Sequence, residues 1–180
     1  MLYIGKKFEN LQKLDVGFFG NEINVEELKF FTTLNYMNMA LFRNLKIFKF
    51  YCDEIYKPSP YILYALLTVL KGSQQTLTYF ELEFYRFSDV NQIVNMICSK
   101  NMPLKCVSFK VVRFLSDADI MQIAKMNNSN ELQIKIFMCG RLTPKGVKDV
   151  LSYIERNKLN KQLLYDEKIL KLSTFCKTTD

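Results

Sequence analysis

Histidine is absent from the 180 residues of this chain, and glycine is scarce. Histidine is the usual general base of enzymes and a very common metal ligand, so its absence removes every Ser-His and Cys-His nucleophile pair. The six glycines are dispersed, and they form neither a phosphate-binding loop nor a G-x-S-x-G nucleophile turn. We therefore predict a protein that is not an enzyme and that binds no cofactor.

The five cysteines lack the spacing of a metal site or of a disulfide framework. Zinc sites are commonly built from C-x-x-C pairs and histidines, and this sequence has neither. We expect no bound metal, and we expect reduced, mostly buried thiols. The cysteines are Cys52, Cys98, Cys106, Cys139 and Cys176.

Long apolar segments are also missing. The longest mostly apolar run, Tyr61 to Leu70, has about half the length that a membrane-spanning helix needs. The N-terminal residues include Lys6 and Lys7 and have no apolar core, which is unlike a secretory signal. These observations predict an intracellular protein, cytoplasmic or nuclear, without membrane association.

The chain does contain a repeating unit. The pattern Leu77-x-x-Phe80-x-Leu82 recurs as Leu104-x-x-Val107-x-Phe109, and looser copies occur on either side. The first leucines of the five copies are Leu11, Leu45, Leu77, Leu104 and Leu132, and they stand closer together toward the C-terminus. A period of roughly 20 to 50 residues, within which all of these spacings fall, is typical of stacked repeats. We predict strands near residues 11–16, 45–50, 77–82, 104–109 and 132–137, and a sixth near 162–165.

Each of the first five predicted strands is followed by a predicted helix. A serine or threonine at the N-cap accepts a hydrogen bond from a backbone N–H of the first turn, and proline is tolerated at the first helical position. Apolar residues follow these starts at helical spacing, as in Val90, Ile93, Val94 and Ile97. We expect helices to begin near Asn24, Ser59-Pro60, Ser88, Ser116 and Thr143-Pro144.

The repeats predict the fold class. One strand and one helix cannot bury their apolar faces alone, whereas stacked copies form a continuous core in which each unit contacts only its neighbours. The composition, 49% hydrophobic and 24% charged, is ordinary for a soluble domain. We predict a single α/β domain over residues 1–180, a solenoid of five to six repeats with a parallel sheet on its concave face and helices on its convex face.

The segments Leu77–Leu82 and Leu104–Phe109, each followed by a capped helix, resemble leucine-rich repeats. The spacing of the later repeats is similar to that of the ribonuclease-inhibitor-like subclass, and the resemblance covers roughly residues 8 to 165. It implies a right-handed α/β superhelix. The subclass is common in fungal F-box proteins, where the repeats hold the substrate of an SCF-type ubiquitin ligase. The resemblance thus implies a substrate receptor, which would contact an SCF adaptor only if an F-box lies outside this chain.

Alternation along the strands predicts a binding surface. Residues that flank the buried positions point away from the core, and here they mix aromatic with charged side chains, as protein interfaces tend to do. We therefore expect a non-catalytic module that binds another protein. The candidate residues are Lys13, Asp15, Lys49, Tyr51, Tyr79, Glu81, Glu83, Ser108, Lys110, Gln133, Lys135 and Phe137.

The formal net charge of +7 gives an alternative, a basic scaffold that binds nucleic acid. The distribution of charge favours a protein partner instead. Lys6-Lys7, Lys158 and Lys161 stand near the two ends of the chain, while Glu81 and Glu83 interrupt the middle of the expected sheet. A third interpretation, a structural subunit of a larger assembly, also fits the sequence.

Overall fold

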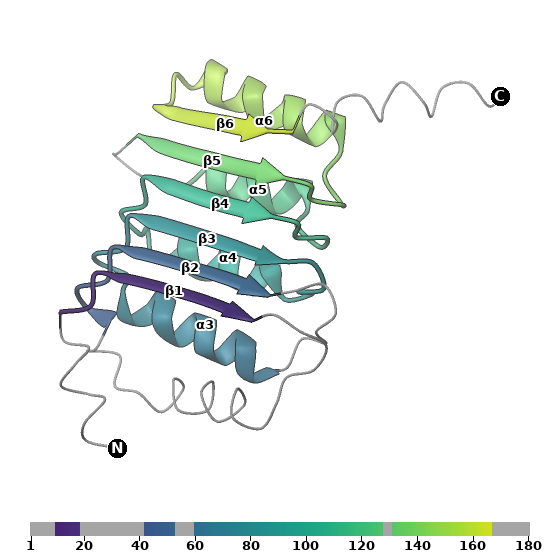
Figure 1. The fold of residues 1–180 in the computed structure, drawn as a ribbon. Coiled ribbons are helices and arrows are strands. Elements are labelled where there is room, and N and C mark those ends of the chain that lie inside the picture. Colours follow the sequence, from purple (N-terminus) through teal and green to yellow (C-terminus); the bar gives the residue numbers. More distant parts are fainter. Residues whose placement is uncertain (1–9, 19–41, 53–59, 128–130, 167–180) are drawn as a thin grey trace.

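The computed structural model describes residues 10–18, 42–52, 60–127 and 131–166. In these residues six strands form one parallel sheet, and their order in the sheet is their order in the chain (Figure 1). Each strand therefore pairs with the strand before it and the strand after it. The strands are β1 Lys13–Phe18, β2 Ile47–Cys52, β3 Tyr79–Phe84, β4 Cys106–Lys110, β5 Leu132–Phe137 and β6 Lys161–Tyr165.

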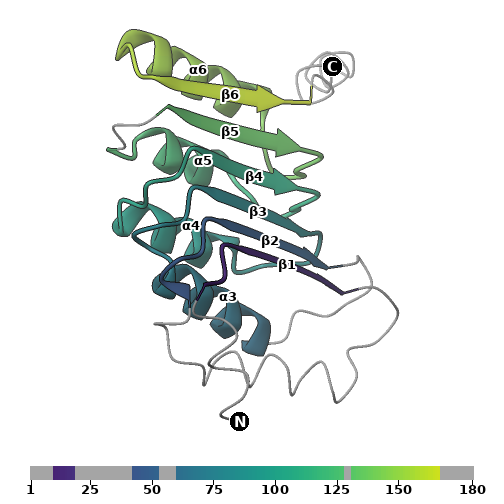
Figure 2. The same ribbon diagram turned by 60° about the vertical axis from the view of Figure 1, so that its left-hand side comes forward.

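Four helices connect successive strands from β2 to β6, and they all lie on one face of the sheet (Figures 1 and 2). The described chain is thus a two-layer α/β structure, as the sequence predicts at this level. The longest of these helices have 13 residues, and within the described ranges none has the length and apolarity to cross a bilayer. They are α3 Pro60–Gly72, α4 Val90–Ser99, α5 Asp117–Ala124 and α6 Pro144–Arg156.

The first four predicted strands begin two residues too early. Leu77 and Leu104 are fully buried, but each precedes its strand and lies in the turn that leads into it. A buried leucine at the start of a repeat therefore marks the turn and not the first paired residue. The predicted β5 has the observed bounds, and the predicted sixth strand starts one residue late.

The register also corrects the alignment of the fifth repeat. Cys106 pairs with Gln133, and Leu104 stands two positions before Cys106, so Glu131 and not Leu132 corresponds to Leu104. Leu132 is a paired strand residue, two positions before the inward-facing Ile134. The interval between these two repeats is therefore one residue shorter than the leucines suggest.

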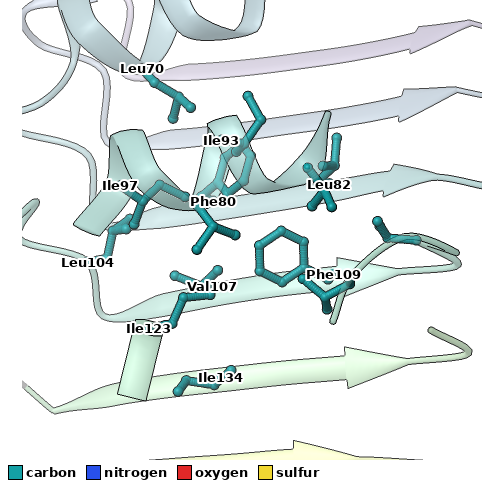
Figure 3. Packing of buried hydrophobic residues seen from close by; sticks show 14 of the residues in the cluster. Leu70, Phe80, Leu82, Ile93, Ile97, Leu104, Val107, Phe109, Ile123 and Ile134 are labelled. Carbon is teal, nitrogen blue, oxygen red and sulfur yellow. The ribbon is translucent and has the colours of Figure 1, made fainter. Parts of the chain in front are cut away.

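Phenylalanine rows between the sheet and the helices organise the core. The ring centroids of Phe48 and Phe80 are 5.8 Å apart, and those of Phe80 and Phe109 are 6.3 Å apart, so rings on three neighbouring strands contact one another. Figure 3 shows Phe80 packed among aliphatic side chains of the sheet and helices, including Ile93 and Ile97. Complete burial of one such side chain stabilises the fold by about 1.5–3 kcal/mol.

The helix starts follow the predicted chemistry at three places. Proline occupies the first position of α3 and α6. Ser116 caps α5 in a reciprocal capping box with Asp119, and the Thr143 side chain accepts a hydrogen bond from the backbone N–H of Gly146 in α6. At α4 a helix begins close to the predicted place, but the predicted cap is wrong, because Asp89 and not Ser88 is the N-cap residue and no side chain caps that end. The predicted helix near Asn24 lies outside the described residues.

Lys161, the first residue of β6, is buried although its side chain is cationic. Its ammonium group donates hydrogen bonds to the backbone carbonyl oxygens of Ala124, at 2.7 Å, and Met126, at 2.5 Å. These carbonyls lie at the C-terminal end of α5, where a cation is favourable. Burial lowers the pKa of Lys161. The hydrogen bonds of Lys161 therefore connect β6 to the C-terminal end of α5. Because the side chain is buried, it adds little to the positive charge of the protein surface.

The cysteines of the described chain are free thiols. Cys52, Cys106 and Cys139 are buried, and Cys98 is partly exposed. Burial raises the pKa of Cys98 to about 12 and that of Cys139 to about 11. Such thiols stay protonated at neutral pH, which makes them poor nucleophiles. Cys176 lies outside the described residues.

Candidate functional site

The candidate residues gather on the sheet face opposite to the helices, which we call the outer face. They fall into three rows that the parallel register aligns across the strands. One row runs through Asp15, Lys49, Glu81, Ser108 and Lys135. The rows on either side hold Lys13, Tyr79 and Gln133, and Tyr51, Glu83, Lys110 and Phe137. The alternation of the strands thus brings together residues that are far apart in the sequence.

Glu81, in the centre of β3, is the hub of a hydrogen-bond network on the outer face. Its Oε1 accepts a hydrogen bond of 2.9 Å from the Tyr51 hydroxyl and one of 3.0 Å from the Lys110 ammonium group. Its Oε2 accepts a hydrogen bond of 2.7 Å from the Tyr79 hydroxyl. One carboxylate therefore joins side chains from β2, β3 and β4.

Burial and hydrogen bonding act in opposite directions on Glu81. Burial by itself raises the pKa of this carboxyl group, but the hydrogen bonds from Tyr79, Lys110 and Tyr51 outweigh it, and the net pKa is lowered. For the two tyrosines, burial and then the hydrogen bond to the Glu81 carboxylate raise the pKa. The network at neutral pH thus consists of an ionised Glu81 that accepts hydrogen bonds from Lys110 and from two protonated phenols.

The network fixes two aromatic side chains at the surface. Tyr51 and Tyr79 are both half-buried, and each is anchored through its hydroxyl, so their rings keep apolar surface toward solvent with little rotational freedom. The Lys49 ammonium group lies 5.5 Å from the centroid of the Tyr79 ring and adds a cation–π contact. Pre-ordered tyrosines lose little entropy when a partner binds.

Two predicted residues contribute no accessible surface. Glu81 is 2% exposed and Ser108 is 0% exposed, although both lie on the outer face. Glu81 is enclosed by the side chains that bond to it, so it acts as a positioning residue beneath the surface. The Ser108 hydroxyl oxygen has no hydrogen-bond partner. Both residues are therefore removed from the set that a partner can touch.

The other predicted residues lie around the network without joining it. Lys13 and Asp15 form an exposed ion pair at 3.6 Å on β1. Phe137 of β5 is 37% exposed and Leu164 of β6 is 42% exposed, and together they give the outer face an apolar end. Leu164 pairs with Lys135, two residues before Phe137. Leu164 was missed because β6 was predicted only as a closing strand, but its alternation with the buried Leu163 would have identified it.

A second group that the sequence interpretation missed lies where the strands end. Arg86, Arg113 and Arg141 occupy the loops that follow β3, β4 and β5, and all three are exposed. We call this group the arginine row. The spacing of Arg86 and Arg113 matches the spacing of their repeats, and Arg141 follows one residue later than that spacing gives; this recurrence is the signal that could have revealed them.

The chemical capacity of the outer face lies in hydrogen bonding and apolar contact. Both oxygens of Glu81 already accept hydrogen bonds, and solvent scarcely reaches them. Within the described ranges, no three cysteine, aspartate or glutamate side chains cluster as metal ligands would. What the face presents is two anchored tyrosines, several lysines and an apolar end, which is chemistry suited to recognition.

Comparison of the chain with models of known protein families, with curated proteins and with solved structures finds no match.

Proposed function

We propose that this chain is a non-catalytic, leucine-rich-repeat-like module that binds another protein on the outer face of its sheet. The observation that carries the proposal is the network around Glu81, which holds Tyr51 and Tyr79 at the centre of a sheet face that no described helix covers. Tyrosines fixed in this way have the character of binding hot spots.

The solenoid architecture is part of the same proposal. Strand order that follows chain order, and helices on one face, are what a stack of strand–helix units with nearest-neighbour contacts requires. If the resemblance to F-box leucine-rich-repeat proteins extends to function, the bound protein is a substrate marked for degradation.

The test is affinity capture with two matched variants. The outer-face variant, Lys49→Ala with Phe137→Ala, removes one lysine and one aromatic ring from the sheet. The control variant, Lys148→Ala with Tyr64→Ala, removes one lysine and one aromatic ring from the helical side, where both are exposed. Mass spectrometry of proteins bound to each variant and to the unmodified chain gives the readout.

A protein partner retained by the unmodified chain and the control, but lost with the outer-face variant, supports the proposal. Equal capture by all three would contradict it. Recovery of an SCF adaptor supports the ubiquitin-ligase role. Release of the bound material between low and moderate salt, together with nucleic acid in the bound fraction, favours the nucleic-acid scaffold instead, because phosphate contacts weaken steeply with salt.

A further inference from the structure

The arginine row recurs once in each of three consecutive repeats, at equivalent positions for Arg86 and Arg113 and one residue beyond the equivalent position for Arg141. Three of the five arginines of the chain belong to it, and each stands in the loop between a strand and the next helix. Scattered solubilising charges would not need to recur once in each repeat. The recurrence places the same cationic group at the same edge of three consecutive units.

The loops that carry the row are hydrogen-bonded to one another as extensions of the sheet. The backbone N–H of Arg113 donates to the carbonyl of Tyr85 at 3.3 Å, and Arg141 forms a parallel backbone bridge with Ser116. Val111 and Met138, directly after β4 and β5, have φ values of 55° and 54° and turn the two loops in the same way. The arginines are thus held on a regular, stacked backbone.

Two of the three guanidinium groups, those of Arg113 and Arg141, also lie over aromatic rings. That of Arg141 lies 4.5 Å from the centroid of the Phe114 ring. That of Arg113 lies 5.8 Å from Phe114 and 5.8 Å from Tyr85. Such cation–π contacts restrict the motion of a guanidinium group, while its N–H donors stay available for other bonds.

No carboxylate neutralises the row within the described residues. The two ion pairs found there are elsewhere, between Lys13 and Asp15 and between Lys110 and Glu81. The two acids that follow Arg113 in sequence, Asp117 and Asp119, already accept hydrogen bonds. Asp117 accepts two hydrogen bonds from Thr143, from its N–H at 2.9 Å and from its hydroxyl at 2.6 Å. Asp119 is likewise bound by Ser116 in the capping box of α5.

We infer that the arginine row is a docking edge for an acidic, aspartate- or glutamate-rich segment of a partner protein. A planar guanidinium with free N–H donors binds a carboxylate through two parallel hydrogen bonds. Three such groups on successive loops fit an extended acidic segment that crosses them. This edge is distinct from the outer face and does not depend on the function proposed for it.

The ring contacts favour a polypeptide over single-stranded nucleic acid. Proteins that hold single strands stack bases on free aromatic faces. Here Arg113 and Arg141 both lie over Phe114, and Arg113 also lies over Tyr85. An acidic polypeptide needs no free aromatic face, because its carboxylates bind the guanidinium groups directly.

The test measures binding of a fluorescein-labelled peptide of alternating glutamate and glycine by fluorescence polarisation. A peptide with glutamine in place of glutamate and a single-stranded RNA are the comparison probes. The row variant carries Arg86→Gln, Arg113→Gln and Arg141→Gln. The control variant, Lys145→Gln, Lys148→Gln and Arg156→Gln, removes three exposed charges from α6 instead.

We expect the row variant to bind the acidic peptide about tenfold more weakly, since three exposed arginine–carboxylate pairs, each weak alone, are lost together. The control variant should bind the peptide like the unmodified chain, as should the outer-face variant. Equal losses in the row and control variants, or equal binding of the glutamine peptide, would overturn the inference. Tighter binding of RNA, abolished by the row variant, would assign the edge to nucleic acid and overturn it as well.

Circular dichroism checks that each variant is folded. If the row variant does not fold, the three single arginine variants replace it, and each should still weaken binding measurably. A variant with lysine at all three positions keeps the positive charge but lacks the planar guanidinium group that can form two parallel hydrogen bonds with a carboxylate. We expect its affinity to lie between those of the unmodified chain and the row variant.

Discussion

The hydroxyl of Tyr79 donates a hydrogen bond of 2.7 Å to Oε2 of Glu81, two residues further along the same strand. Residues i and i+2 of a strand share a face, so this bond joins two outward side chains of β3. Because Tyr51 and Lys110 reach the other carboxylate oxygen from the neighbouring strands, Glu81 ties three strands together on the side that the helices do not cover.

Replacing Glu81 with alanine should lower the free energy of unfolding by about 2–3 kcal/mol, because three donors lose an acceptor that is charged and shielded from solvent. Urea unfolding measures the change. Glu83→Ala is the matched control, since Glu83 lies on the same strand and face and is only half-buried. We expect the control to change stability by no more than about 0.5 kcal/mol. Equal effects of the two substitutions would show that the network contributes nothing.

The network also predicts how stability varies with pH. The pKa of Glu81 is lowered in the folded chain, so its contribution is present above its ordinary value of 4.5 and is lost as the pH falls below it. The pKa values of Tyr51 and Tyr79 are raised, so their contribution is present below their ordinary value of 10.0 and is lost as the pH rises beyond it.

The urea concentration at the midpoint of unfolding, measured from acidic to alkaline pH, tests both the predicted loss of stability in acid and the predicted loss in alkali. In Glu81→Gln the loss of stability in acid should be smaller than in the unmodified chain, because glutamine does not titrate. In Tyr51→Phe with Tyr79→Phe the alkaline loss should be smaller. Parallel pH profiles for all three proteins would contradict the prediction.

Gly146, in the first turn of α6, should not tolerate alanine. A Cβ atom built there would lie 2.0 Å from Cγ of Asp117, the carboxylate that binds Thr143. Alanine normally stabilises a helix by about 1 kcal/mol relative to glycine, but overpacking costs about 1–3 kcal/mol, so we expect a net loss. In an Asp117→Ala background the same substitution should become neutral or stabilising. A gain in thermal stability from Gly146→Ala alone would refute this explanation.

Replacing Lys158, which follows α6, with glycine should stabilise the protein. Its φ is 49°, and its N–H donates to the carbonyl of Glu155 while the N–H of Leu159 donates to that of Ile154, the bonding pattern of a Schellman cap. A left-handed lysine costs roughly 1 kcal/mol more than glycine. We expect Lys158→Gly to raise the melting temperature and Lys148→Gly, within the same helix, to lower it. Changes of the same sign would argue against a strained cap.

Much of the architecture follows from the sequence because its apolar pattern is local and repeated. Phe80 with Leu82 and Val107 with Phe109 set the inward positions of two strands, and the following helices give the parallel direction. The strand starts were less predictable. Leu77 is as apolar as a strand residue, and only the backbone pairing shows that it lies in a turn.

The site was predictable as a face but not as a network. Alternation indicates that Tyr51, Tyr79 and Glu81 point outward, yet Tyr51 and Glu81 belong to different repeats and are far apart in the sequence. Their contact depends on a register that no single segment encodes. The burial of Glu81 follows from that contact, so exposure could not be deduced from alternation alone.

The order of the strands makes the length of this protein adjustable in whole units. Cys106 and Gln133 occupy equivalent positions, so a second copy of residues 106–132 placed after residue 132 would insert one strand and one helix. No existing pair of strands except β4 and β5 would have to separate. The insertion would also bring a second copy of Arg113, which would extend the arginine row by one member. A longer arginine row would accommodate a longer acidic segment.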